Sequence, residues 1–344
     1  MDAIEIDGSA GEGGGQILRT SLALSLLTLR PFRLIRVRAR RKKPGLAPQH
    51  LKSIQAAVAI SNSKVEGATL RSQEIVFEPG EVIRSNYRFD IGTAGATSLV
   101  FQTVCYPLAI KAAGSSVSIT GGTHVPQSPS YHYLSLQWLP WIQRLGYEMQ
   151  LDLKRAGYYP RGGGEIEAAI GVHHKTTPAL LLEGRGAITE LNILSTYTNL
   201  PLTVAERQLK TAAALLRQAG LTFTDAIEEI PGFGAGCQLI IHAKFETGSC
   251  AYFALGERGK PAEKVGEEAA ARFLEFHRSS GAVDQYLADQ LLLPAILQRN
   301  RTQFSCSKIT QHLLTNTEII CKFCPVRIQI EGEIGKPGSV TIEP

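Results

Sequence analysis

Apolar positions near the start of the chain change from one spacing to another. Residues 4–6 alternate apolar and polar side chains, as a strand does, and leucines recur from Leu18 to Leu29 on one helical face. Between them, the segment from Gly8 to Gly15 contains five glycines. The pattern predicts a short strand, a tight glycine turn and a helix.

The next apolar pattern predicts a strand with an arginine face. From Ile35 to Arg40, apolar side chains alternate with arginines. Because successive side chains of a strand point to opposite faces, one face would be buried and the other would carry ordered guanidinium groups. Such a row suits a ligand with repeated phosphates. Pro44 and Gly45 predict the turn that ends this strand, and Pro48 predicts the first turn of the following helix.

The same order of elements recurs along the chain. After this first unit we expect a strand at 87–91, a helix at 98–111, a strand at 117–120, a helix at 131–145, and strands at 148–153 and 165–170. This predicts a β-α-β-α-β-β unit of about 80 residues, seen twice, with a third copy over 286–342. The predicted fold class is α/β of the α+β type, with three such units forming the main domain.

A segment with a different pattern separates the second unit from the third. It predicts a strand at 187–195, a helix at 202–218, strands at 238–243 and 250–255, and a helix at 262–276. Glycine-containing turns flank it on both sides. We therefore expect a smaller inserted α/β domain at 183–281, with the main domain formed by 1–182 and 282–344.

Composition favours a globular protein without a membrane span. The chain is 44% hydrophobic and 19% charged. The uncharged stretch from Ile91 to Ile110 has the length of a membrane span, but its glycines, threonines and Pro107 favour a packed core helix. Acidic residues occupy the place of a basic leader region, and six scattered cysteines favour reduced thiols. The predicted location is cytoplasmic.

Charge is distributed unevenly. The net charge is +5, yet residues 13–65 hold eleven Lys and Arg and no Asp or Glu, so the remainder of the chain carries −6. Cations concentrated in this way predict a polyanionic partner.

The glycine turn is a candidate phosphate site. Backbone N–H groups at such a turn, together with a helix N-terminus, bind anions. Glu12 would repel phosphate unless a cation lay between them, which suggests a Mg²⁺ contact. The spacing is not that of a Walker A loop. A tight turn without a ligand is the alternative that the residues alone leave open.

Five motifs follow one another in a recognisable order. They are Gly8–Thr20, Arg38–Leu46, Gly121–Thr123, Tyr286–Gln290 and His312–Asn316. Together they resemble the RNA 3′-terminal phosphate cyclase family, from Ile4 to Ile342. The resemblance implies repeated β-α-β-α-β-β units with a smaller inserted domain. It also implies an ATP-dependent ligase that converts an RNA 3′-phosphate to a 2′,3′-cyclic phosphodiester, using Mg²⁺ or Mn²⁺.

The resemblance implies a covalent mechanism centred on His312. This residue matches the histidine that receives AMP from ATP, before AMP passes to the RNA as RNA(3′)pp(5′)A and leaves on cyclisation. The residues around it agree with this role, because Thr310 is a plausible N-cap. His312 would then lie in the first helical turn, where the positive end of the dipole favours a neutral imidazole.

Further site residues are implied by the same resemblance. Glu12 matches a metal-binding acid, and the residues that match nucleotide contacts are Gln102, Pro126, Phe253 (or Tyr252), Tyr286, Leu287, Ala288, Asp289 and Gln290. A basic cluster suited to the RNA terminal phosphate matches Arg19, Arg38, Arg41 and His50. From the residues alone, a buried polar residue on a core helix is the better interpretation of Gln102, and an ordinary helix start with Asp as a cap is the alternative for 286–290.

The chain departs from the family pattern at two positions. His124 and His132 stand where the family commonly has acid-like residues, which bears on metal use and substrate preference. Two alternatives remain at this point: a non-catalytic cyclase-like RNA-binding factor in ribosome assembly, and an enolpyruvyl transferase-like enzyme, which shares the repeated-unit architecture.

Overall fold

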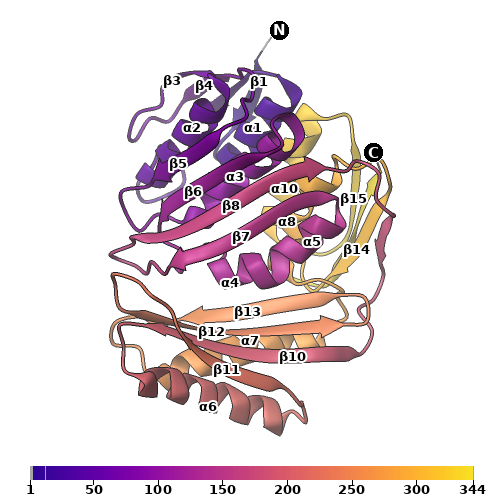
Figure 1. Cartoon of the computed structure of the whole chain (residues 1–344). Helices are drawn as coiled ribbons and strands as arrows, with labels where there is room; N and C mark the ends of the chain where they lie inside the picture. The colour runs from indigo at the N-terminus through magenta and orange to yellow at the C-terminus, as the bar shows by residue number, and fades with distance from the viewer. Residues whose placement is uncertain (1–2, 12, 344) are drawn as a thin grey trace.

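Helices and strands form four layered α/β units in the computed structural model, which describes residues 3–11 and 13–343 (Figure 1). The first unit contains β1 (Ile4–Asp7), α1 (Gly15–Thr28), β2 (Phe32–Ile35), α2 (Pro48–Ser61), β3 (Lys64–Glu66) and β4 (Ile75–Glu78). The second contains β5 (Asn86–Asp90), α3 (Thr97–Lys111), β6 (Ser115–Gly121), β7 (Tyr147–Arg155) and β8 (Gly164–His173). One continuous helical segment, α4 (Tyr131–Tyr133), η1 (Leu134–Trp138) and α5 (Leu139–Arg144), connects β6 to β7.

The third unit is split by the fourth. Its strands are β9 (Leu180–Leu182), β14 (Thr302–Cys306), β15 (Arg327–Gly332) and β16 (Gly338–Glu343), and its helices are α8 (Gln285–Gln290), α9 (Leu292–Ala295) and α10 (Gln311–Phe323). Between β9 and α8 the chain forms β10 (Ile188–Thr198), α6 (Leu202–Gln218), β11 (Thr224–Glu229), β12 (Gly236–Phe245), β13 (Ser249–Leu255) and α7 (Ala262–Arg278).

Three of the sheets have the same strand order. In each, the first strand pairs in parallel with the second, and the second and third strands both pair antiparallel to the fourth. The resulting orders are β1-β2-β4-β3, β5-β6-β8-β7 and β9-β14-β16-β15. The α+β class predicted from the sequence is confirmed. An insertion after β9 agrees with this topology, and the limits at 183 and 281 stay a prediction.

The helices of the three similar units meet in one hydrophobic core. Helix α1 packs against α2, α3 and α10, and a single buried cluster extends through all three units. Leu22, Leu24 and Leu26 of α1 are fully buried although they point in different directions around the helix. Burying each such side chain contributes about 1.5–3 kcal/mol. This packing holds the start of α1 beside α8 and α10.

The fourth sheet has the helices of its own unit, α6 and α7, on one face only. Leu239 and Ile241 of β12 pack with α6 and α7 in a separate cluster, whereas Ile240 joins the main core. The helical segment α4–η1–α5 lies along this second face (Figure 1). There Gln137 and Trp141 hydrogen-bond to Ser249, which fixes the fourth unit against the second.

The predicted arginine strand over 35–40 is wrong. Strand β2 ends at Ile35, and residues 36–43 form turns in which Arg36 and Arg38 have φ of 54° and 53°. Close packing explains the break: a Cβ on Gly8 would lie 2.9 Å from the Cα of Val37, so the glycine turn and this segment touch through their backbones. The arginines therefore diverge instead of forming a row.

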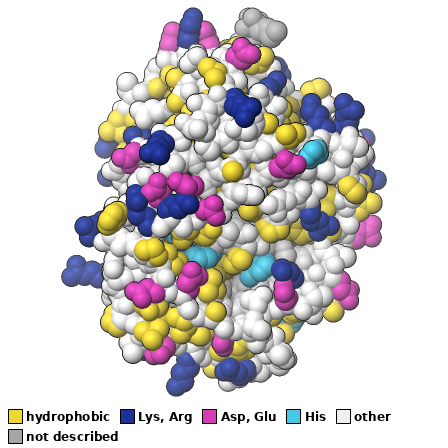
Figure 2. Space-filling view, viewed as in Figure 1, with side chains coloured by type: hydrophobic (Ala, Val, Ile, Leu, Met, Phe, Trp, Pro, Cys, Tyr) yellow, Lys and Arg dark blue, Asp and Glu magenta, His cyan; other side chains and the backbone are white. Residues whose placement is uncertain are grey.

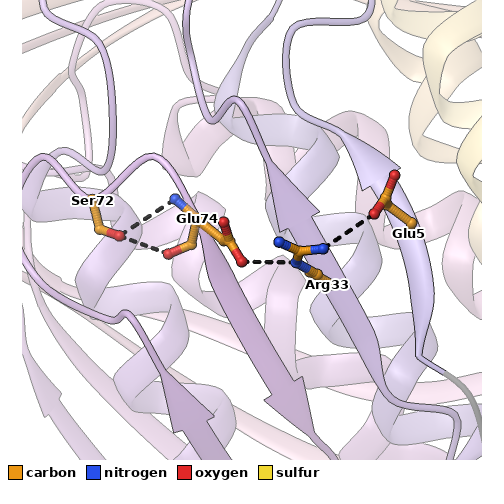
Figure 3. Close-up of polar contacts among 4 residues, drawn as sticks. All are labelled: Glu5, Arg33, Ser72 and Glu74. Atoms are coloured by element: carbon orange, nitrogen blue, oxygen red, sulfur yellow. Dashed lines mark hydrogen bonds and ion pairs between the residues drawn. The ribbon is translucent and has the colours of Figure 1, made fainter.

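Some of the basic residues between positions 13 and 65 form ion pairs with carboxylates on the outer face of the first sheet. Arg33 of β2 lies between Glu5 and Glu74, with N–O distances of 3.4 and 2.7 Å, and the Ser72 hydroxyl supports the turn before Glu74 (Figure 3). Arg36 pairs with Asp7 at 2.6 Å. The visible face of the molecule likewise mixes cations and anions without one dominant sign (Figure 2).

Within the described part of the chain, no helix is both long enough and apolar enough to cross a bilayer. The stretch from Ile91 to Ile110 forms the end of a turn and most of α3, whose residues are largely buried. This agrees with the core helix expected from its glycines and threonines.

We predict that Arg33→Met weakens stability only at low salt. Both carboxylates beside Arg33 are exposed, so their attraction is screened when the Debye length falls to about 3 Å near 1 M salt. Urea unfolding should show a lower midpoint for the variant in dilute buffer and no difference in high salt. Arg88→Met, on the exposed face of β5, is the matched control. A deficit that persists at high salt would show that the Arg33 stem contributes packing instead.

Candidate active site

The glycine turn places backbone against two candidate side chains. Gly11 and Gly13 have φ of +53° and +55°, a region that favours glycine, and α1 begins at Gly15. A Cβ on Gly14 would lie 4.0 Å from Cε1 of His312 and 3.8 Å from Nη2 of Arg41. The turn, the candidate nucleophile and a cation thus share one site. Glu12 lies outside the described residues, so its metal role stays a prediction.

Gln16 links Asp289 to His312. Its Nε2 donates to Oδ2 of Asp289 at 3.0 Å, and its Oε1 contacts Nδ1 of His312. An ionised carboxylate only accepts hydrogen bonds, so the amide must turn its NH₂ toward Asp289 and its oxygen toward the imidazole. The amide oxygen also only accepts, so Nδ1 of His312 carries a proton. In the neutral form of the ring, the unprotonated nitrogen is Nε2.

Buried hydrogen bonds hold the three helices that carry this chain of contacts. Thr310 is the N-cap of α10, as predicted, and its hydroxyl accepts from the N–H of Leu313 at 3.1 Å. Thr20 of α1 donates to Asn316 of α10 at 2.7 Å, and Asn316 donates to the carbonyl of Asp289 at 3.1 Å. A shift of one helix would break contacts to both others.

The carboxyl group of Asp289 titrates near neutrality. Removal from water raises its pKa to about 7, opposed by the Gln16 hydrogen bond and the charge of Arg19. Burial also lowers the pKa of Arg19 to about 10, which leaves its guanidinium charged at neutral pH. Asp289 is thus ionised above about pH 7 and increasingly neutral below it.

The predicted basic cluster gathers around the same turn. A Cβ on Gly15 would overlap the ring of His50 and lie 2.8 Å from Nη1 of Arg19. Arg38 donates to the carbonyls of Lys43 and Gly45, each at 3.1 Å, which holds the loop. Arg41 completes the cluster beside Gly14. Of the arginines in the basic segment, these three face the turn, whereas Arg33 and Arg36 do not.

His50 is a neutral donor within the cluster. Its Nδ1 accepts from the N–H of Ala47 at 3.0 Å, so its proton lies on Nε2, beside Gly15. Burial, reinforced by Arg19 and Arg38, lowers the pKa of His50 to about 3. His50 therefore offers an N–H to an anion without adding charge.

Gln102, Tyr286 and Gln290 lie together on one side of the site. Gln290 donates to the carbonyl of Tyr286 at 2.6 Å and accepts from Gln102 at 2.7 Å. The nucleotide contact of Gln102 stays a prediction. The Tyr286 ring is 45% exposed and lies 6.1 Å from Tyr252. Phe253 contacts Tyr133, with ring centroids 6.2 Å apart.

Three members of the predicted nucleotide set lie away from this group. The side chains of Leu287 and Ala288 are fully buried, so they pack in the core of α8 and leave only backbone to face a ligand. Pro126 lies on an exposed loop that lines a groove with Gln49 and Tyr159, and neither Tyr286 nor Phe253 lines that groove.

Comparison with known proteins agrees with this arrangement. A profile described as RNA 3′-terminal phosphate cyclase matches residues 10–330. Proteins named RNA 3′-terminal phosphate cyclase are 41% identical in Methylococcus capsulatus over 337 residues (96% of this chain, 93% of theirs) and 44% identical in Ralstonia nicotianae over 331 residues (96% and 94%). One from Archaeoglobus fulgidus is 42% identical over 334 residues (96% and 98%).

The chain belongs to the RNA 3′-terminal phosphate cyclase family. The family assignment made from the sequence motifs, and with it the expectation of an enzyme, is confirmed.

The two departures from the cyclase pattern contact each other. His124 and His132 are both buried, with His124 Nε2 2.9 Å from His132 Nδ1. The Thr123 hydroxyl accepts from the N–H of Gly157 and lies 2.7 Å from Nδ1 of His124. A neutral His124 that accepts from this hydroxyl at Nδ1 carries its proton on Nε2 and donates it to His132. Because burial lowers the pKa of both side chains, both imidazoles are neutral at neutral pH.

The described residues of this cyclase-family chain contain no cluster of side chains that could hold a metal ion. Across 3–11 and 13–343, no three or more His, Cys, Asp or Glu side chains come together in a group that could hold an ion. The described residues therefore do not fit a metal held by protein alone, and no step below depends on one.

Sequence reasoning missed several residues that organise this cyclase site. Gln16 follows the glycine run directly and Asn316 belongs to the quoted His312 motif, so both were within reach of the sequence. Asp284 was missed as well: it caps α8 through the N–H groups of Tyr286 and Leu287 and accepts from Tyr133 at 2.9 Å. Burial raises its pKa to about 6.

We predict that the His124–His132 pair makes the protein sensitive to acid. Burial lowers the pKa of His132 to about 4, and that of His124 also lies well below the ordinary value. Between pH 6.5 and 4 the unfolded chain binds protons that the native state excludes, so stability falls as the pH falls, by up to roughly 3 kcal/mol from His132 alone.

The free energy of unfolding, measured from pH 7 to pH 4, should fall less steeply in His132→Asn than in the wild type. Gln218→Asn, at an exposed residue that does not titrate, should keep the wild-type slope. An unchanged slope in His132→Asn would show that the pair does not titrate in this range.

Proposed function

We propose that this chain converts the 3′-phosphate end of RNA to a 2′,3′-cyclic phosphodiester, with ATP cleaved to AMP and pyrophosphate. The observation that carries the proposal is the contact of Gln16 with both Asp289 and His312, beside a glycine turn flanked by Arg19, Arg41 and His50. Family membership supplies the substrate class.

In the first step, Nε2 of His312 attacks the α-phosphorus of ATP. A nitrogen–phosphorus bond forms, the bond to pyrophosphate breaks, and the imidazole of the adduct carries positive charge. Its Nδ1–H stays on Gln16, which transmits the negative charge of Asp289 to the ring. Asp289 therefore stabilises charge that develops during the reaction, without contact to the phosphate.

In the second step, an oxygen of the RNA 3′-phosphate attacks the phosphorus of the adduct. The nitrogen–phosphorus bond breaks, His312 is released, and a phosphoanhydride joins RNA to AMP. The neighbouring 2′-hydroxyl then attacks the RNA phosphorus, loses its proton, and expels AMP. Arg19, Arg38, Arg41 and His50 offset the crowded phosphate charge.

A divalent cation fits this scheme only together with the nucleotide. Mg²⁺ or Mn²⁺ would offset triphosphate charge, and Glu12 is the proposed protein contact. The described residues build no cage for it, so the steps above are assigned to side chains alone.

A non-catalytic RNA-binding role is the less favoured alternative. Such a protein has no need of an imidazole oriented through an amide to a buried carboxylate. An enolpyruvyl transferase-like role is opposed by the match to the cyclase family over residues 10–330.

The direct test is to incubate the protein with ATP, Mg²⁺ and an oligoribonucleotide that ends in a 3′-phosphate. We expect a product lighter by one water and resistant to phosphatase. His312→Ala should give none, whereas His174→Ala, at an exposed histidine, should match the wild type. RNA binding without product in the wild type would favour the non-catalytic alternative.

We predict that Gln16→Leu slows protein–AMP formation roughly 10²-fold, because the imidazole loses its orientation. The readout specific to this role is the pH profile. In the wild type the labelling rate should rise with pH through about 7, as Asp289 ionises and strengthens the Gln16 contact. Asp289→Asn should lower the rate and remove this component. A Gln16→Leu variant with the wild-type rate and profile would refute the positioning role.

A further inference from the structure

A groove is lined by the first turn of α2, the start of α3 and the loop that follows β6. Its volume is about 290 Å³, near the lower end of the roughly 300–1,000 Å³ range of small-ligand sites. Its walls combine apolar side chains, among them Leu99, Val125 and Pro126, with the polar Gln127 and Ser128, and the Tyr159 side chain that also lines it is 72% exposed. A large exposed aromatic ring beside such a groove is a surface on which a flat ring can stack.

One polar group in this groove lacks a partner. The Nε2 of Gln49 is buried and makes no hydrogen bond to any described residue. A buried amide donor without a partner costs about 1–3 kcal/mol. A ligand with hydrogen-bonding groups on its edge would recover this free energy when the side chain turns toward it.

Helix α2 connects the groove to the proposed phosphate site. Gln49, which lines the groove, directly precedes His50 in the first turn of α2, and His50 lies against Gly15 and Arg19. A ligand that places an anionic group on the cluster can therefore place a connected ring in the groove. A nucleoside 3′-phosphate has this form.

We propose that the groove binds the base of the 3′-terminal nucleoside of the RNA, with Tyr159 and Pro126 as stacking surfaces and Gln49 as the reader of the base edge. This inference rests on the proposed function. Proteins commonly recognise single-stranded RNA by stacking bases on aromatic side chains and hydrogen-bonding their edges.

The chemistry requires two base sites. The RNA–AMP intermediate holds two nucleosides joined through two phosphates, so both bases must be accommodated around one phosphate cluster. Gln102, Gln290 and Tyr286 form one group, and none of them lines the groove. We assign that group to the adenosine and the groove to the RNA.

Measuring the two half-reactions separately distinguishes a groove that binds RNA from a groove that binds adenosine. Protein–AMP formation needs ATP alone, whereas AMP transfer from preformed protein–AMP needs RNA. Gln49→Leu and Tyr159→Ala should label with ATP at the wild-type rate but raise the RNA concentration for half-maximal transfer roughly tenfold. Gln55→Leu, on the exposed side of the same helix, is the matched control and should change neither step.

An oligoribonucleotide whose terminal 3′-phosphate nucleotide lacks a base gives a second test. It should bind the wild type about tenfold more weakly than the intact oligonucleotide, and Tyr159→Ala should add no further loss. Slow ATP labelling in the variants would assign the groove to adenine and overturn the proposal. Unchanged RNA dependence, or equal binding of the abasic end, would also overturn it. If the wild type neither labels nor cyclises, the proposed function itself fails and the inference falls with it.

Discussion

The site depends on the orientation of one amide. Gln16 lies between Asp289, which only accepts hydrogen bonds while it is ionised, and an imidazole that can donate. The direction of these two hydrogen bonds decides which nitrogen of His312 is unprotonated. The three residues come from α1, α8 and α10, and the third unit supplies two of them on either side of β14. The shared core of α1 with α10 therefore supports the chemistry as well as stability.

The arginines between positions 13 and 65 fall into two groups with different surroundings. Arg33 and Arg36 form ion pairs with carboxylates on the outer face of the first sheet, and Arg30 donates to the last carbonyls of α10. Arg19 and Arg38 turn inward with their charge only partly offset. The net excess of cations seen in the sequence thus becomes a compact cluster at the glycine turn, and the visible surface stays mixed in charge (Figure 2).

Local signals predicted much of this architecture. The strand, glycine turn and helix at the start, the Thr310 cap and the α+β class follow from spacing and residue type. The arginine strand failed because its alternation competes with a backbone contact between Gly8 and Val37, which belong to different elements. Distant contacts such as Gln16 with Asp289, or His124 with His132, are set by packing, and a linear pattern carries no signal for them. The site roles of individual residues stay predictions.

The orientation of His312 is open to direct measurement. Nitrogen NMR of selectively labelled histidines, assigned with His312→Ala, reports which ring nitrogen carries the proton. Our account predicts a neutral ring protonated at Nδ1 at pH 8 in the wild type, and a shift toward mixed tautomers in Gln16→Leu. A ring protonated at Nε2 in the wild type, or the same tautomer with and without Gln16, would contradict it.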